Sequence, residues 1–184
     1  PARAWRPAVV ARLARTLGRI NMVLWHVSER EDITVFHPRV PPNADAGVTD
    51  PVVWAVSNDR LPNYLLPRDC PRVCFWIGQD TTSGDRTRFF LTESTYSVAI
   101  EPSWMNSARA TSLFLYKLPT VAFNCIDANA GYFVSTQSVV PLSRHVITDL
   151  PGSFHKRGVE LRTEANLRVT SHVIMHLFVA GRFS

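Results

Sequence analysis

Residues 52–77 read VVWAVSNDRLPNYLLPRDCPRVCFWI, a stretch that joins two strands without a long helix. Val52–Ser57 and Arg72–Ile77 are apolar and rich in β-branched or aromatic residues, which is typical of strands. Between them, Asp59 can cap a short helix that runs through Leu66, with Pro67 ending it. The stretch therefore predicts neighbouring strands with a short helical connection.

Strands dominate the rest of the chain, and the expected helices are short and scattered. Tyr96, Val98 and Ile100 alternate with small residues, which predicts a strand with one buried face. Further strands are expected at residues 23–27, 112–118, 121–126, 139–148 and 159–162. Helices are expected to begin at Thr82 or Ser83, Pro102, Asp149 and Thr163, the last running to about residue 180. Sequential strands with few long crossover helices predict an α+β fold with mixed or antiparallel sheets.

The net charge of +5 comes from the first 21 residues. Residues 1–21 contain five arginines and no acid, which leaves 15 of the 20 basic side chains to balance the 15 acidic ones. We therefore expect a basic N-terminal arm at 1–21 and one globular domain at 22–184. A neutral domain offers no broad electrostatic surface to a phosphate backbone, so duplex nucleic-acid binding by the domain is not expected.

The arm has apolar residues at helical spacing, including Leu13, Leu17 and Ile20, with arginines on the other face. Several interpretations stay open. The arm can be a membrane-surface helix, an organellar transit segment or a nucleic-acid arm. It can also pack on the domain, or precede the natural start, because Met22 directly opens the first strand. No apolar run approaches the ~18 residues that a transmembrane helix needs.

The three cysteines, Cys70, Cys74 and Cys125, do not form a disulfide framework. Reduced thiols in a cytoplasmic protein are the simpler interpretation, with Cys70 and Cys74 buried. No further soft ligands are spaced to complete a metal site.

His26 is the candidate catalytic residue. It lies late in the first expected strand, and Ser28 points to the same side because side chains two apart on a strand share a face. An imidazole at the end of a strand can donate to a ribose hydroxyl or serve as an acid or base. The alternative is a core histidine that is satisfied by a backbone carbonyl.

Arg39, Arg68 and Arg72 form a second candidate set, which we call the arginine group. Prolines flank all three, which lowers the entropy cost of holding a guanidinium. Such groups suit phosphate or carboxylate ligands. The alternative is that Asp69 pairs with one of them and that all are ordinary surface charges.

Aromatic side chains form the third set. Trp54, Tyr64 and Tyr132 are candidates to stack on a base or a nicotinamide ring, and both tyrosines keep a polar hydroxyl. Trp76 and Phe133 are expected in the core, since aromatic residues in strands usually pack there.

Several short motifs together resemble a family of small bacterial proteins of unknown function. They are LWHVSE (24–29), HPR (37–39), VWA (53–55), LPNYLLPRDCPR (61–72), LY (115–116), GYFVS (131–135) and VP (140–141). The PRDCPR stretch (67–72) is specific, and the resemblance covers roughly residues 22–162. It implies kinship and no activity.

More distantly, the chain resembles the ADP-ribosyltransferase-like fold, which often opens with a strand ending in His followed closely by Ser or Thr, as His26 and Ser28 do. In that fold the His contacts the ribose of NAD, and Trp54 and Tyr64 stand where pocket aromatics occur. The strand that usually supplies a catalytic Glu corresponds to residues 131–135, which contain no acid. RNA phosphotransferases of related shape use Arg and His, a part that the arginine group would play here.

Together these features predict a pocket for a nucleotide or a phosphorylated small molecule, with NAD or another nucleotide as the implied ligand. His26 would contact ribose, the arginine group would bind phosphate, and Tyr64 or Tyr132 would stack on a ring. An enzyme of this kind would transfer a ribosyl or phosphoryl group. The alternative is a non-enzymatic binding or interaction domain on a transferase scaffold that has lost its activity.

Overall fold

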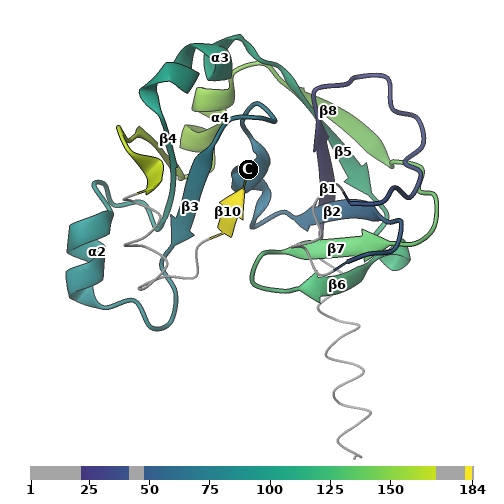
Figure 1. Cartoon of the computed structure of the whole chain (residues 1–184), viewed down its shortest axis with the longest axis horizontal. Helices are drawn as coiled ribbons and strands as arrows, with labels where there is room; N and C mark the ends of the chain where they lie inside the picture. The colour runs from purple at the N-terminus through teal and green to yellow at the C-terminus, as the bar shows by residue number, and fades with distance from the viewer. Residues whose placement is uncertain (1–21, 42–47, 169–180, 184) are drawn as a thin grey trace, which may run out of the picture.

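A computed structural model describes residues 22–41, 48–168 and 181–183 of the chain. Within these residues ten strands form two sheets, joined by short helices (Figure 1). The strands are β1 (Leu24–Ser28), β2 (Val53–Ser57), β3 (Arg72–Trp76), β4 (Tyr96–Ile100), β5 (Leu113–Leu118), β6 (Asn124–Asp127), β7 (Tyr132–Ser135), β8 (Ser143–Ile147), β9 (Glu160–Thr163) and β10 (Gly181–Phe183). The helical elements are η2 (Leu61–Tyr64), α2 (Ser83–Phe89), η3 (Pro102–Trp104), α3 (Met105–Ala110), η4 (Thr120–Ala122) and α4 (Leu150–Lys156).

The larger sheet has six strands in the order β6-β7-β2-β1-β5-β8, and every pair in it is antiparallel. The smaller sheet has the order β10-β3-β4-β9, and its β4–β9 pair is parallel. Mixed sheets with short helices confirm the predicted α+β class. In Figure 1 the two sheets lie side by side, with α3 and α4 together at one end.

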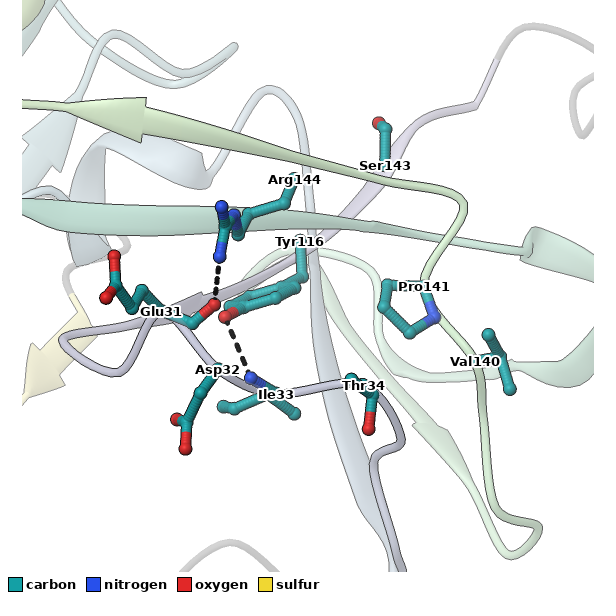
Figure 2. A pocket seen from close by; sticks show the side chains of 9 residues that line it. All are labelled: Glu31, Asp32, Ile33, Thr34, Tyr116, Val140, Pro141, Ser143 and Arg144. Carbon is teal, nitrogen blue, oxygen red and sulfur yellow. Dashed lines mark hydrogen bonds between the residues drawn. The ribbon is translucent and has the colours of Figure 1, made fainter.

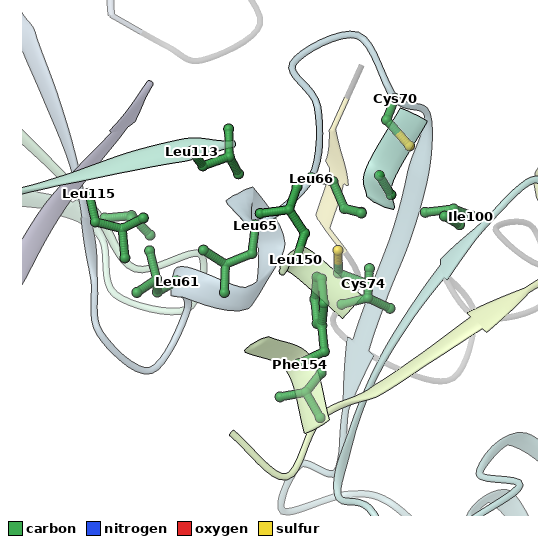
Figure 3. Close-up of a cluster of buried hydrophobic side chains, with 14 residues drawn as sticks. Leu61, Leu65, Leu66, Cys70, Cys74, Ile100, Leu113, Leu115, Leu150 and Phe154 are labelled. Carbon is green, nitrogen blue, oxygen red and sulfur yellow. The ribbon is translucent and has the colours of Figure 1, made fainter. Parts of the chain in front are cut away.

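Two apolar clusters give the larger sheet an inner and an outer face. The inner cluster contains residues of both sheets, such as Leu115 of β5 and Cys74 of β3, together with Leu61 and Leu65 of the η2 segment (Figure 3). The outer cluster contains residues of the larger sheet and its loops, such as Leu24 and Phe36. We call the face toward the inner cluster the inner face and the opposite one the outer face.

Most strands occur where the sequence predicts them, and the caps of α2 and α4 also agree. The Thr82 side chain accepts a hydrogen bond from the backbone N–H of Asp85 and completes a capping box at α2. Asp149 caps α4 through the backbone N–H of Gly152. Gly158 follows α4 with φ of 66°, the left-handed conformation that favours glycine at the end of a helix.

Five expectations are corrected. The helix expected from Asp59 to Leu66 is a single 3-10 turn, η2, whose N-cap position is Arg60 without a side-chain cap. Strand β4 is buried on both faces rather than one, because Ser97 and Ala99 also lie in the interior. The strand expected at 139–148 is limited to β8, and the one expected at 121–126 begins only at Asn124, after the turn η4. Thr163 ends β9 instead of capping a helix.

The body of the last expected helix, residues 169–180, lies outside the described residues, as does the arm at 1–21. Strand β10 was not predicted from the sequence. Both Cys70 and Cys74 are buried free thiols, as expected, and burial raises their pKa values to about 11 and about 12. Among the described residues, no helix has the length and apolarity needed to cross a membrane.

Arg72 organises the connection between η2 and β3. Its side chain is buried, and its guanidinium donates to the backbone carbonyls of Cys70, Asn63, Pro67 and Arg68 at 2.5 to 3.3 Å. Burial lowers the pKa of this side chain, and no carboxylate forms an ion pair with it within the described part of the chain. The charge is stabilised by carbonyl dipoles, which fix the path of residues 63–72.

We expect Arg72→Met to lower the free energy of unfolding by about 3 kcal/mol, since four carbonyls lose a charged donor and stay partly buried. Urea unfolding at equilibrium measures this change. Arg109→Met is the matched control, because Arg109 is exposed on α3 and its loss should cost less than about 0.5 kcal/mol. Equal stability of the two variants would contradict the role given to Arg72.

Candidate functional site

The pairing of β1 with β2 stops partway along both strands. It covers two residue pairs, Leu24 with Ser57 and Trp25 with Val56. The backbone N–H of Asn58 donates to the carbonyl of Val23. Because backbone groups alternate in direction along a strand, those of Val56 and Trp54 also point toward β1. Continued pairing would place Trp54 opposite Val27, yet these described residues are not a pair of the β1–β2 ladder. The strands therefore part at the end of the sheet where β1 ends and β2 begins.

The His26 side chain occupies the point where the two strands part. Its Nδ1 lies 2.9 Å from the backbone carbonyl oxygen of Trp54. A carbonyl can only accept, so Nδ1 carries the proton and donates it. Neutral His26 therefore has its lone pair on Nε2, where it can accept a hydrogen bond or a proton.

The surroundings of His26 favour the neutral imidazole. Burial lowers its pKa, and the positive charges of Arg68 and Arg39 act in the same direction, against the hydrogen bond to Trp54. The ring of Phe36 packs at 4.5 Å between centroids and covers one side of the imidazole. His26 is therefore hydrogen-bonded to a backbone carbonyl, as in the non-catalytic interpretation of this residue. It also lies near two positively charged side chains, Arg39 and Arg68.

Arg68 and Arg39 are each tied to the open end of β1 and β2. The backbone N–H of Arg68 donates to the carboxylate of Glu29, the residue after β1, at 2.9 Å. Arg39 forms a two-way backbone bridge with Val52, the residue before β2, at 3.0 Å in both directions. Both arginine side chains are exposed, and neither forms an ion pair within the described ranges. The backbones of two arginines distant in sequence are therefore held at the end of the sheet where β1 and β2 part.

The third member of the arginine group, Arg72, is placed differently, because its guanidinium is occupied by backbone carbonyls.

Ser28 shares the face of His26, as expected from the strand period. Its hydroxyl oxygen accepts a hydrogen bond from the backbone N–H of Arg30 at 3.1 Å and so helps to turn the chain after β1.

The three predicted aromatic residues come together, but on the inner face. The rings of Trp54 and Tyr132 make an edge contact at 5.7 Å, and the hydroxyls of Tyr132 and Tyr64 are hydrogen-bonded to each other. Trp54 is one residue from Val53 and Ala55, which pack in the outer cluster, so its side chain has the opposite direction. Tyr64 packs against the inner cluster, and burial raises its pKa. The structure does not bring these rings to the face of His26.

A shallow depression of about 360 Å³ lies on the outer side, next to Tyr116 (Figure 2). Glu31, Asp32, Ile33, Thr34, Tyr116, Val140, Pro141, Ser143 and Arg144 line it. The Tyr116 hydroxyl donates to the carbonyl of Arg30 and accepts from the N–H of Ile33, and it thereby holds the segment after β1. All predicted site residues are described, and none of them lines this depression.

Sequence reasoning missed three residues that shape the surroundings of His26, namely Glu29, Phe36 and Tyr116. Glu29 and Phe36 lie on segments that the sequence marks only as a strand end and a short extended piece. Tyr116 is opposite His26 in the β1–β5 ladder, and its ring contacts that of Phe36. Such pairing is not visible in a single sequence. No cluster of three or more His, Cys, Asp or Glu side chains in the described part of the chain is placed to hold a metal ion.

The chain belongs to the family described as "Family of unknown function (DUF6886)", which matches residues 25–181. This agrees with the resemblance to an uncharacterised family. No curated protein matches the chain. No solved structure matches it either, so the likeness to the ADP-ribosyltransferase-like fold stays a hypothesis.

Acid should destabilise the protein through His26. Its lowered pKa means that, below pH 6.5, the unfolded chain binds more protons at this position than the folded chain. The contribution of His26 to stability is therefore complete above pH 6.5 and declines as the pH falls toward the lowered pKa. We expect His26→Gln, which keeps a donor for Trp54, to lose less stability than the wild type between about pH 7.5 and about pH 5.

Urea unfolding at several pH values measures the difference. His155→Gln is the control, because His155 is exposed on α4. Parallel stability curves for the wild type and His26→Gln would contradict a partly buried, neutral His26.

Proposed function

We propose that this member of a family of unknown function binds a nucleotide or a phosphorylated small molecule at the open end of β1 and β2. The observation that carries the proposal is the arrangement of His26, held by Trp54, with the Arg39 and Arg68 charges acting on it. In this arrangement the imidazole binds a ribose hydroxyl and the two guanidinium groups bind phosphate. The proposal leaves out Arg72, whose donors are used within the fold.

Phosphate is the ligand chemistry that this arrangement favours. Arg39 and Arg68 are exposed and lack an ion pair among the described residues, so an anion would neutralise charges that no carboxylate balances there. Guanidinium groups also match phosphate oxygens with two parallel hydrogen bonds. A carboxylate would satisfy one such group, whereas a diphosphate has enough oxygens for both.

His26 supplies the chemistry that a hydroxyl-bearing ligand requires. With Nδ1 held by the Trp54 carbonyl, Nε2 accepts a hydrogen bond from a ribose hydroxyl. If that hydroxyl attacks a phosphoryl or ribosyl centre, Nε2 is placed to take its proton as the new bond forms and the leaving group departs. Strand β7, Tyr132–Ser135, contains no acid, which favours phosphoryl transfer over ADP-ribosyl transfer.

A binding module without catalysis is the competing function. It would use the same two arginines and His26, with the imidazole acting only as a hydrogen-bond acceptor. Turnover of a bound nucleotide, followed by phosphorus NMR, separates the two: an enzyme consumes it at a rate that His26→Gln abolishes, and a binding module leaves it intact.

Ligand binding should stabilise the folded protein in a saturable way. We expect ADP-ribose, NAD or ATP to raise the free energy of unfolding by about 2.7 kcal/mol at a concentration of about 100 Kd. Arg39→Ala and Arg68→Ala should each weaken binding by about ten-fold or more, because each removes charged hydrogen bonds. Thermal unfolding over a ligand titration provides the measurement.

Arg109→Ala is the matched control, since it removes an exposed arginine from α3 on another part of the molecule. No stabilisation by any nucleotide, or the same stabilisation in all four proteins, would rule out the proposed site.

A further inference from the structure

Glu29 is the first residue after β1, and its side chain holds a loop that is distant in the sequence. One carboxylate oxygen, Oε1, accepts a hydrogen bond of 2.9 Å from the backbone N–H of Arg68. Within the described part of the chain, the other oxygen, Oε2, accepts no hydrogen bond, and the carboxylate forms no ion pair. The carboxylate is therefore fixed in place through one oxygen only.

The segment that this carboxylate holds is a tight turn. The backbone N–H of Cys70 donates to the carbonyl of Pro67 at 3.0 Å, which puts Arg68 and Asp69 at the exposed central positions of a β-turn. On its buried side, the guanidinium of Arg72 donates to the carbonyls of Pro67 and Arg68. The turn is thus restrained by a buried cation as well as by the carboxylate.

Arg68 connects this carboxylate with the proposed phosphate site. Its backbone N–H binds Glu29, and its positive charge acts on His26. The distance between the carboxylate of Glu29 and the guanidinium of Arg68 is therefore limited to about the length of one arginine side chain. Because the carboxylate binds the backbone of this residue, the guanidinium remains available to an anion.

An ionised carboxylate beside a phosphate site selects for hydroxyl groups. It can only accept hydrogen bonds, so it binds the O–H groups of a sugar and repels a second phosphate. The ribose hydroxyls of a nucleotide lie a few bonds from its phosphate. A nucleotide whose phosphate is bound by Arg68 therefore brings its ribose hydroxyls toward Glu29.

We propose that Glu29 is a specificity-determining residue of the proposed site, where it accepts hydrogen bonds from free ribose hydroxyls and disfavours a ligand with a phosphate on that ribose. The inference rests on the proposed function, because it requires a phosphate group at Arg68. Asp69 is exposed in the same turn, but its carboxylate has no hydrogen bond or ion pair within the described ranges. Ordering that side chain on a ligand would cost entropy, whereas Glu29 is already held.

Glu29→Gln tests the inference with three ligands: ATP, dideoxy-ATP without either ribose hydroxyl, and ATP with a phosphate added to its 2′-hydroxyl. Glutamine keeps an oxygen for the N–H of Arg68 and replaces Oε2 with an amide that donates. We expect this change to weaken ATP binding about ten-fold and to leave dideoxy-ATP within about two-fold. Binding of the phosphorylated ATP should become about ten-fold tighter, since a repulsion is removed. Isothermal titration calorimetry measures the three affinities.

Asp69→Asn is the matched control, because it removes one negative charge from the same turn and leaves the hydrogen bond between Glu29 and Arg68 intact. We expect it to change each affinity by less than about two-fold, since an exposed charge is screened by salt. Equal effects of the two substitutions would indicate a general effect of charge and would overturn the inference.

No change in Glu29→Gln, or a change of the same sign for all three ligands, would indicate that Glu29 only holds the turn. Either result would also overturn the inference while the proposed function stands. If the wild type binds no nucleotide, the proposed function fails, and this inference fails with it.

Discussion

The backbone carbonyl of Trp54 needs a hydrogen-bond donor, and it receives one from a side chain instead of from the neighbouring strand. A carbonyl that is shielded from water and has no partner costs about as much as a lost hydrogen bond, and His26 supplies the donor where the β1–β2 ladder stops and the carbonyl is partly buried. This one contact has two consequences. It fixes which ring nitrogen of His26 carries the proton, and it leaves the other nitrogen available at a position where two strands of a sheet part.

The loops around this position are held by hydrogen bonds that do not use the guanidinium groups of Arg39 and Arg68. Arg72 fixes residues 63–72 through four carbonyls, and Glu29 then accepts the N–H of Arg68. Arg39 is held by its bridge to Val52. The two exposed guanidinium groups are therefore free to meet a ligand while the segments that carry them are restrained, which lowers the entropy cost of binding.

Local pattern predicted most strands and the caps of α2 and α4, but not how the strands pair. The periods of 2.0 and 3.6 are local, so β1, β2, α2 and α4 follow from their own residues. Asp59 looked like a helix cap, yet two prolines and the fixed path to Arg72 allow only a 3-10 turn. The alternation of Ser97 and Ala99 with larger apolar residues predicted that one face of this strand is exposed to solvent. β4 is instead a central strand that is buried on both faces.

The candidate site shows the same limit. His26, Ser28, Arg39 and Arg68 were identified from residue type and position in the chain, and they do lie at one end of the sheet. The side chains of Tyr64 and Tyr132 lie on the opposite face of the sheet from His26, which the sequence did not indicate, since the face of a strand residue depends on register and on the cluster it packs in. The buried role of Arg72 has no signal in the sequence beyond its prolines.

The tautomer of His26 is the most direct test of this account. Nitrogen-15 NMR of the imidazole distinguishes a protonated ring nitrogen from one with a lone pair. We expect Nδ1 to carry the proton near neutral pH, and we expect the Nε2 signal to move when ADP-ribose is added. A proton on Nε2, or an Nε2 signal that no nucleotide changes, would contradict the account.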